Sequence, residues 1–178
     1  ISDLNRYDMG YLGSLLQVAR LKLIQILYTG DKVTAKNRRI NPSYIQKYYP
    51  IFQKDLQEDD CTVLFDCFPI VSLDNKSDGL RYVGTIEGSC AFKRIASRAE
   101  LSMYNAHKAT NVNNGTGQSF LFDGDRQMIE VYGNKDIKEL MIEAIFSDPT
   151  KIPTYNINVD PFPMHDGDII QLETIISQ

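Results

Sequence analysis

The chain has 178 residues, of which 43% are hydrophobic and 24% charged, and its formal net charge is −4. This length and composition predict a globular protein of one domain, or of one domain with a long appendage. No apolar run approaches the roughly 20 residues that a membrane-spanning helix needs. The first residues lack the basic and apolar regions of a secretory signal, and the absence of an initiator Met leaves open a longer product.

Charge is unevenly distributed along the chain. Residues 1–54 contain nine Lys or Arg against three Asp or Glu, a net charge of +6, whereas residues 55–178 contain ten against twenty, a net charge of −10. One interpretation is that the two ends of the chain face different partners. The other is a scatter of solvated surface charge.

A small basic group lies in residues 31–39, which we predict to be a polar loop. Its cations Lys36, Arg38 and Arg39 are candidate contacts for a partner or for DNA, because Lys and Arg bind phosphate. A solvated loop is the alternative. The three cysteines, Cys61, Cys67 and Cys90, have no metal-ligand spacing, so we expect buried free thiols in a reducing compartment.

Residues 11–28 are predicted to form the first helix, followed by Gly30 at the position of a C-cap. Apolar residues recur there at steps of three and four, as on one helix face: Leu12, Leu16, Ala19, Leu23 and Ile26.

Asn41 and Pro42 then predict an N-cap and a first-turn proline, which would open a short helix through Tyr49. Pro50 would kink or break this helix, and a second short helix is expected to about residue 57. Residues 1–58 are therefore expected to form a helical N-terminal segment, and residues 59–178 an α+β domain with a C-terminal helix.

From residue 61 the sequence pattern changes to that of strands. Residues 61–73 form a strand-like run that Pro69 interrupts, and residues 81–86 and 90–95 are predicted to be two strands of a hairpin that turns at Glu87-Gly88. Ser97 and Glu100 have the spacing of a capping box, which predicts a helix from there to about Lys108. Residues 111–117 are expected to be a loop.

The stretch FLFDGDRQMIEVYGN, residues 120–134, predicts a second hairpin. Asp123, Gly124 and Asp125 would form its turn, with Gly124 expected to adopt the positive φ that such turns require. Residues 138–146 are a further strand candidate, and residues 166–176 a final helix with Ile169, Leu172 and Ile176 on one face. The whole pattern predicts the α+β class, with a small, mostly antiparallel sheet flanked by N-terminal and C-terminal helices.

Candidate catalytic and metal-binding groups do not form a recognisable site. Asp123 and Asp125 lack the further alternating oxygen ligands of a calcium loop, and Asp166 and Asp168 are better explained as helix-capping carboxylates. Neither His107 nor His165 has a nucleophile at a known spacing, and the sequence contains no P-loop, GxGxxG or CxxC motif. We therefore expect no enzyme, no metal and no cofactor.

The order of the motifs resembles a known family. RYVGTIEGSCAFKRI is followed by a short helix, by FLFDGDRQMIEVYG, by KELMIEAIFSDPTKI and by a proline-bearing VDPFPM that leads into a helix. This order is similar to that of head-to-tail connector proteins of tailed bacteriophages, most closely the ring protein that docks below the portal in crAss-like phages. The resemblance covers about residues 60–178 and the leading helix, and it rests on diffuse strand motifs.

The resemblance implies a structural virion protein located at the head-to-tail interface, and in the host cytoplasm during assembly. Such proteins form a ring, expected to be a dodecamer, below the portal; they extend the DNA channel and provide a platform for tail attachment. The implied partners are copies of the chain, the portal protein, adjacent tail or ring proteins and phage DNA, with no membrane. The alternative is a β-rich carbohydrate- or ion-binding module on a phage or bacterial surface, with calcium at Asp123 and Asp125 beside exposed aromatic residues.

Overall fold

The computed structural model describes residues 2–29, 41–56, 62–73, 78–87, 90–100, 103, 118–133 and 136–177. The chain divides into two compact units, each built from segments that lie far apart in the sequence. Unit 1 comprises residues 1–46, 71–79 and 145–178, and unit 2 comprises residues 47–70 and 80–144. Both units combine residues from either side of position 58. Among the described residues, no helix is both long and apolar enough to cross a membrane.

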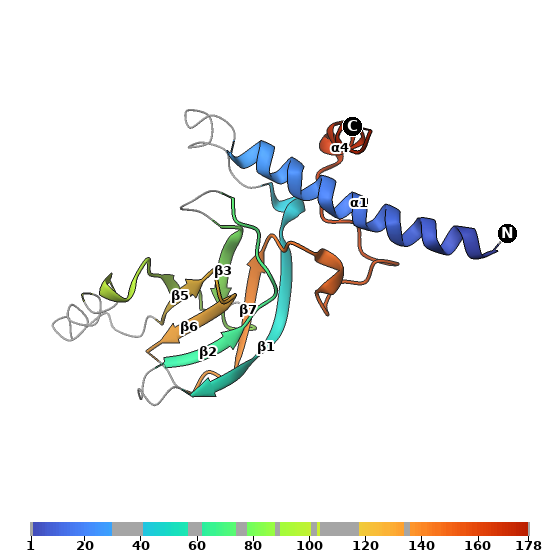
Figure 1. Ribbon diagram of the computed structural model, residues 1–178. Coiled ribbons are helices and arrows are strands. Elements are labelled where there is room, and N and C mark those ends of the chain that lie inside the picture. The colour runs from blue at the N-terminus through green and yellow to red at the C-terminus, as the bar shows by residue number, and fades with distance from the viewer. Residues whose placement is uncertain are drawn as a thin grey trace. The chain divides into compact units, whose positions relative to one another are not determined.

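A seven-stranded sheet forms the body of unit 2 (Figure 1). Its strands in chain order are β1 (Gln46–Leu56), β2 (Thr62–Asp66), β3 (Leu80–Gly84), β4 (Lys93–Arg94), β5 (Ser119–Asp123), β6 (Met128–Tyr132) and β7 (Glu139–Ala144). Their order across the sheet is β3-β7-β1-β2-β6-β5-β4. The β4/β5 pair is parallel, whereas β1/β2, β2/β6, β3/β7 and β5/β6 are antiparallel. The α+β class is confirmed. The sheet differs from the small, mostly antiparallel sheet that was predicted, because it has seven strands, is curled, and is mixed through its parallel β4/β5 pair.

The curl of the sheet brings its two edge strands, β3 and β4, toward each other. Gly84 forms an isolated antiparallel bridge with Ala91, and the Phe92 N–H donates to the Val83 carbonyl at 2.8 Å. A Cβ on Gly84 would lie 2.3 Å from the Cys90 carbonyl oxygen, so only glycine permits this approach. The hairpin predicted for residues 81–95 is therefore present only as these few contacts, because its second arm pairs with β5 instead.

Strand β1 replaces the two short helices predicted between residues 42 and 57. Only Pro42–Tyr44 is helical, as a 3-10 turn (η1), and Asn41 caps it as expected by accepting a hydrogen bond from the Ser43 N–H at 3.0 Å. Pro50 lies inside β1 and lacks the N–H that a helix would need there. Aromatic and β-branched residues surround it, and they favour an extended chain. Exposed positions alternate with less exposed ones in residues 46–49 and again in residues 50–54, as expected of a strand.

The core of unit 2 is formed by side chains on opposed strands. In the register of the sheet, Val63 lies opposite Val131 and Phe65 opposite Ile129, and all four are fully buried. On the other side of β6, Phe120 also lies opposite Val131, as the second predicted hairpin requires. Most positions of β2 and β6 are buried on both faces, which explains why these strands show no simple alternation of polar and apolar residues.

Two further local predictions concern the capping box at Ser97 and Glu100 and the burial of the cysteines. The Glu100 N–H donates to Ser97 Oγ at 3.2 Å, and the Glu100 carboxylate accepts from the Ala96 N–H at 2.7 Å, which confirms the capping box with a one-residue offset. Cys67 is half-buried and Cys90 exposed, so the expectation of buried thiols is wrong for Cys90. Residues 31–39, 61, 107 and 111–117 lie outside the described part of the chain.

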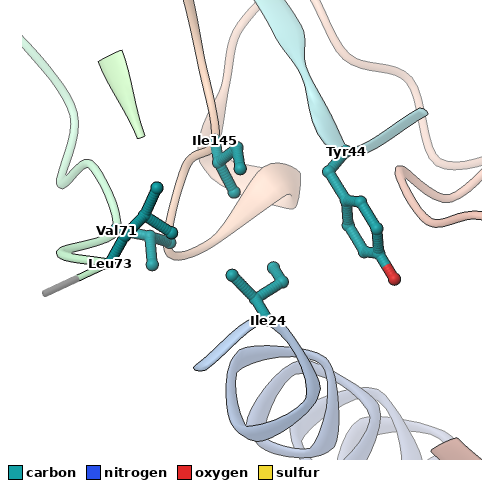
Figure 2. Close-up of a cluster of buried hydrophobic side chains, with 5 residues drawn as sticks. All are labelled: Ile24, Tyr44, Val71, Leu73 and Ile145. Atoms are coloured by element: carbon teal, nitrogen blue, oxygen red, sulfur yellow. The ribbon is translucent and has the colours of Figure 1, made fainter. Parts of the chain in front are cut away.

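Unit 1 contains the long helix α1 (Ser2–Thr29), the 3-10 turns η1, η2 (Pro149–Lys151) and η3 (Asp166–Asp168), and the helix α4 (Ile169–Ile176). Two clusters of buried side chains hold these elements together. In one, Ile24 of α1 points toward Tyr44, Val71, Leu73 and Ile145 (Figure 2). In the other, Ala19 and Leu23 of α1 pack against Leu172 of α4. Burial of each large aliphatic side chain contributes about 1.5–3 kcal/mol, so α1 is fixed mainly by these two contacts.

The connection between the three segments of unit 1 is a set of backbone hydrogen bonds. The Val71 N–H donates to the Ile145 carbonyl at 2.9 Å, the Ile145 N–H to the Gly79 carbonyl at 3.0 Å, and the Gly79 N–H to the Val71 carbonyl at 2.7 Å. A Cβ on Gly79 would lie 2.9 Å from Cβ of Ile145, so glycine is needed for this close approach.

Arg20 is the one polar side chain of α1 that lies fully inside the core of unit 1, among the residues whose side chains are described. Its Nε donates to the Pro163 carbonyl at 2.9 Å and its Nη1 to the Phe146 carbonyl at 3.0 Å, while Nη2 has no described hydrogen-bond partner. The guanidinium also lies 5.8 Å from the centre of the Phe162 ring. Burial lowers the pKa of Arg20 to about 10, with Tyr44, Tyr155 and Asp148 acting in the opposite direction. Arg20 thus ties α1 to two points of the C-terminal segment.

We expect Arg20→Met to destabilise the protein by about 2–4 kcal/mol, because it deprives buried carbonyls of charged hydrogen-bond donors. The matched control is Lys22→Met, an exposed change on the same helix that should alter stability by less than about 0.5 kcal/mol. Urea unfolding of the two variants and the wild type measures the difference. Equal stabilities of the two variants would contradict the role given to Arg20.

Candidate functional site

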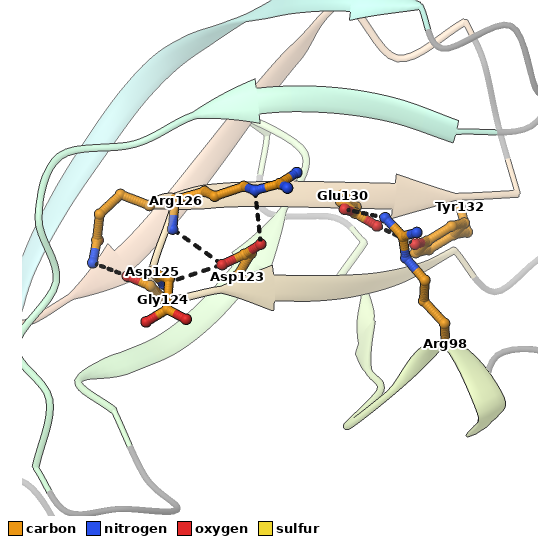
Figure 3. A network of polar contacts seen from close by, with 8 residues as sticks. Arg98, Asp123, Gly124, Asp125, Arg126, Glu130 and Tyr132 are labelled. Atoms are coloured by element: carbon orange, nitrogen blue, oxygen red, sulfur yellow. Dashed lines mark hydrogen bonds and ion pairs between the residues drawn. The ribbon is translucent and has the colours of Figure 1, made fainter.

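The predicted turn at Asp123, Gly124 and Asp125 is present between β5 and β6. Asp123 and Met128 form the last pair of the ladder, and residues 124–127 form a four-residue loop. Oδ1 of Asp123 accepts from the N–H groups of Asp125 and Arg126 at 3.1 and 3.0 Å (Figure 3). Its Oδ2 lies 3.7 Å from Arg126 Nε. The carboxylate of Asp123 therefore serves the turn itself.

Gly124 does not have the positive φ expected of it, and this prediction is wrong. The positive φ belongs to Gln127, at 53°. In a four-residue loop the left-handed residue comes last, just before the second strand, and the Asp-Gly sequence misled us because it is typical of two-residue turns. The strain at Gln127 is offset by its side chain, whose Oε1 accepts from the Ile70 N–H at 2.9 Å and whose Nε2 donates to the Gly124 carbonyl at 2.6 Å. Its backbone carbonyl also accepts from the Cys67 N–H at 3.0 Å.

Next to this turn lies an open hollow of about 490 Å³. It is lined by a mixture of charged and apolar side chains together with one glycine: Arg98, Leu121, Phe122, Asp123, Gly124, Arg126 and Glu130. Glu130, on β6, is only 4% exposed. Its carboxylate is held by Arg98 Nη2 at 2.9 Å on one oxygen and by the Tyr132 hydroxyl on the other (Figure 3).

The charges of the hollow are satisfied within it. Arg98 pairs with Glu130, and Arg126 lies beside Asp123, so each cation has an anionic neighbour. Burial raises the pKa of Tyr132, and its hydrogen bond to Glu130 raises it further. The contact with Glu130 also raises the pKa of Arg98. The described residues that line the hollow include no Ser, Cys, His or Lys that could act as a nucleophile. The paired charges therefore indicate a role in stabilising the fold.

The second Asp-Gly-Asp sequence, at residues 166–168, differs from its predicted role. The cap of η3 is His165, whose Nδ1 accepts from the Gly167 N–H at 3.1 Å, and Asp168 makes no capping hydrogen bond to α4. Instead, Asp168 Oδ2 accepts from the Tyr44 hydroxyl at 2.6 Å. Burial and this hydrogen bond raise the pKa of Tyr44. Among the described residues, no group of three or more His, Cys, Asp and Glu is arranged to hold a metal ion.

The uneven charge of the sequence is partly neutralised inside the units. Lys47 pairs with Glu143 at 3.3 Å and Lys54 with Asp66 at 2.8 Å, each joining the basic first part of the chain to the acidic remainder. The two terminal helices, α1 and α4, lie in the same compact unit, although the ends of the chain were expected to face different partners. The candidate contacts for a partner or DNA, Lys36, Arg38 and Arg39, lie outside the described residues, so that prediction stays a prediction.

The remaining candidate is a surface. Among the residues that the structure describes, twelve large hydrophobic side chains are exposed, and nine of them belong to unit 1. Four are on α1, two are in residues 157–159 and three are on α4: Tyr11, Leu12, Val18, Ile26, Ile157, Val159, Ile169, Ile170 and Ile176. Single exposed apolar residues are ordinary, but their concentration on three elements of one unit makes these elements candidates for an interaction surface. The periodicity of α1 placed Leu12, Ala19, Leu23 and Ile26 on one face, but only Ala19 and Leu23 of these are buried, whereas Leu12 and Ile26 are exposed. The sequence pattern therefore did not separate the buried side of α1 from the exposed one.

We expect Gly124→Ala to change stability by less than about 0.5 kcal/mol, because the added methyl would meet only Phe122 Cε1, at 3.7 Å. Gln127→Ala should cost about 1–3 kcal/mol, since it leaves the N–H of Ile70 without this acceptor. Thermal or urea unfolding with and without calcium measures both. A larger loss for Gly124→Ala, or a calcium-dependent stabilisation that Asp123→Ala abolishes, would contradict this view of the turn.

Tyr132→Phe should lower stability by about 1–3 kcal/mol at pH 8, because it removes a hydrogen bond to a buried carboxylate. The folded-state pKa of Tyr132 is raised above the ordinary value of 10.0, so its stabilising contribution is complete below pH 10 and is lost as pH rises beyond it. The difference between wild type and variant should therefore shrink from pH 9 to pH 11 in urea unfolding. A difference that is constant or grows over this range would contradict the assignment.

Comparisons with known proteins supply no family for this chain. No protein-family model matches it, and no curated protein matches it either. Its function therefore has to be inferred from its own residues and surfaces.

Proposed function

We propose that the chain is a structural protein that works through its surfaces, and that it forms a ring of identical subunits in the head-to-tail connector of a tailed bacteriophage. In this role it docks below the portal, extends the DNA channel and offers a platform to the next tail protein. It carries out no catalysis, and its partners are copies of itself, the portal, adjacent tail proteins and the DNA that passes through the channel.

The observation that supports this proposal is the concentration of exposed apolar side chains in unit 1. Ile170 is 74% exposed and Val159 76%, and both lie in a unit whose helices already share a packed core. A chain that keeps such residues in water gains free energy when a partner covers them. A structural subunit that is covered on several sides by neighbours has this property, whereas an enzyme needs a concave site with reactive groups.

The resemblance of the motif order to connector proteins supplies the biological setting of the proposal. It accounts for the hairpin at residues 119–132 as a structural element, in keeping with an Asp123 carboxylate that hydrogen-bonds its own turn. A carbohydrate- or ion-binding module would use the same carboxylate for a ligand, and no described contact favours that use.

We expect the purified chain to be mainly monomeric at nanomolar concentration and to add in many copies to the portal of the same phage. Premature closure of a ring would compete with assembly on the portal, and head-to-tail contacts strengthen each other only when the ring closes. Mass photometry of the chain, the portal and their mixture measures this, with Asp125→Ala as a surface control that should assemble normally. A chain that does not join the portal, or joins it in one copy only, would contradict the proposed function.

A further inference from the structure

Helix α1 has a second apolar stripe besides the face that is buried in unit 1. With 3.6 residues per turn, residues 11, 15, 18, 22 and 26 lie along one side of the helix, and the buried residues Leu23 and Ile24 lie on another. This side, which we call the outer stripe, consists of Tyr11, Leu15, Val18, Lys22 and Ile26. Tyr11, Val18 and Ile26 are 66%, 54% and 59% exposed, and Lys22 is exposed as well. Steps of three and four residues are typical of a helix face that packs against another helix.

Helix α4 also has an unpaired side. Leu172 is buried against α1 of the same chain, and Ile175 packs at the edge of that cluster. Ile169, Ile170 and Ile176 remain 42%, 74% and 40% exposed, and Glu173 between them is exposed too. We call these four residues the outer face of α4: Ile169, Ile170, Glu173 and Ile176.

The outer stripe and the outer face each combine exposed apolar side chains with one charged side chain, and the two charges have opposite sign. On α1, Lys22 follows Val18 by one helical turn, and on α4, Glu173 follows Ile169 and Ile170 by one turn. Two α1 stripes packed in parallel and in register would bring Lys22 near Lys22, and two α4 faces packed in this way would bring Glu173 near Glu173. Packing of α1 against α4 instead brings opposite charges together over apolar contacts, which favours that pairing over the other two.

We propose that the outer stripe of α1 on one copy of the chain binds the outer face of α4 on the next copy, with Lys22 and Glu173 forming an ion pair between them. This inference rests on the proposed function, because it specifies the contact through which copies assemble. The two surfaces are different parts of one unit, so the contact is heterologous, and repetition of such a contact gives a ring when the rotation closes. Apolar burial supplies the affinity, and the ion pair selects the partner helix and its register.

Charge reversal tests the contact directly. Lys22→Glu and Glu173→Lys should each weaken self-association of the full chain by about three- to tenfold, because each puts like charges at the contact. The double variant should recover to within about twofold of the wild type. An equimolar mixture of the two single variants should recover as well, since each copy can then pair with the other kind. Sedimentation velocity over a micromolar to millimolar series at low salt measures the association constants.

Two controls separate the contact from other effects. Lys138→Glu makes the same charge change on an exposed residue of unit 2 and should leave the association constant unchanged. Thermal unfolding of the single variants should match the wild type, which excludes a loss of fold as the cause. At 1 M salt the Debye length is about 3 Å, so the differences between variants should become small.

The outcomes distinguish this contact from the proposed function itself. A wild-type chain that stays monomeric throughout the series, or single variants that behave like Lys138→Glu, would overturn the α1–α4 contact. Failure of the mixture to recover would overturn it as well, because recovery on mixing requires a contact between copies. In each case, binding of many copies to the portal would still support the connector role.

Discussion

The buried guanidinium of Arg20 is the polar interaction on which the path of the C-terminal segment of unit 1 depends. It donates to the carbonyls of Phe146 and Pro163, which are 17 residues apart in a segment with little regular structure. These two hydrogen bonds fix two points of the path that leads from β7 to α4, and the hydrogen bonds of Gln17 to Asp148 and of Tyr44 to Asp168 fix two more. Because α1 supplies both Arg20 and the apolar residues beneath α4, one face of this helix organises the whole C-terminal segment. The opposite side of α1 carries the outer stripe, which we propose binds a neighbouring copy.

Three carboxylates contribute to the stability of the fold through hydrogen bonds to their neighbours. Asp123 stabilises its own turn, Glu130 is enclosed by Arg98 and Tyr132, and Asp168 accepts from Tyr44. Of these three carboxylates only that of Glu130 is buried, and a buried carboxylate is costly unless it is hydrogen-bonded, so Arg98 and Tyr132 are required for stability. None of the three is arranged with a nucleophile or with further ligands in the described residues. The same contacts that make these groups stable also make them poor candidates for binding a ligand.

Local signals in the sequence predicted those elements whose stability is local. The helix at residues 11–28, the capping box at Ser97 and the hairpin around Gly124 all depend on neighbours within a few residues, and each is present. Strand β1 was missed because Asn41 and Pro42 do begin a helical turn, but the pairing of β1 with β2 then overrides its continuation. The parallel β4/β5 pair and the Tyr44–Asp168 hydrogen bond join residues far apart in the sequence, and no local pattern specifies them. For the same reason, the exposed stripe of α1 could not be separated from its buried face by periodicity alone.

The central claim is that the chain functions by packing against other subunits, and a cryo-EM map of the native particle tests it most directly. The account predicts a ring of copies below the portal in which the side of α1 that carries Tyr11, Val18 and Lys22 is covered by a neighbouring subunit. A particle that lacks the chain, or a map in which this side of α1 faces solvent in every copy, would contradict the account.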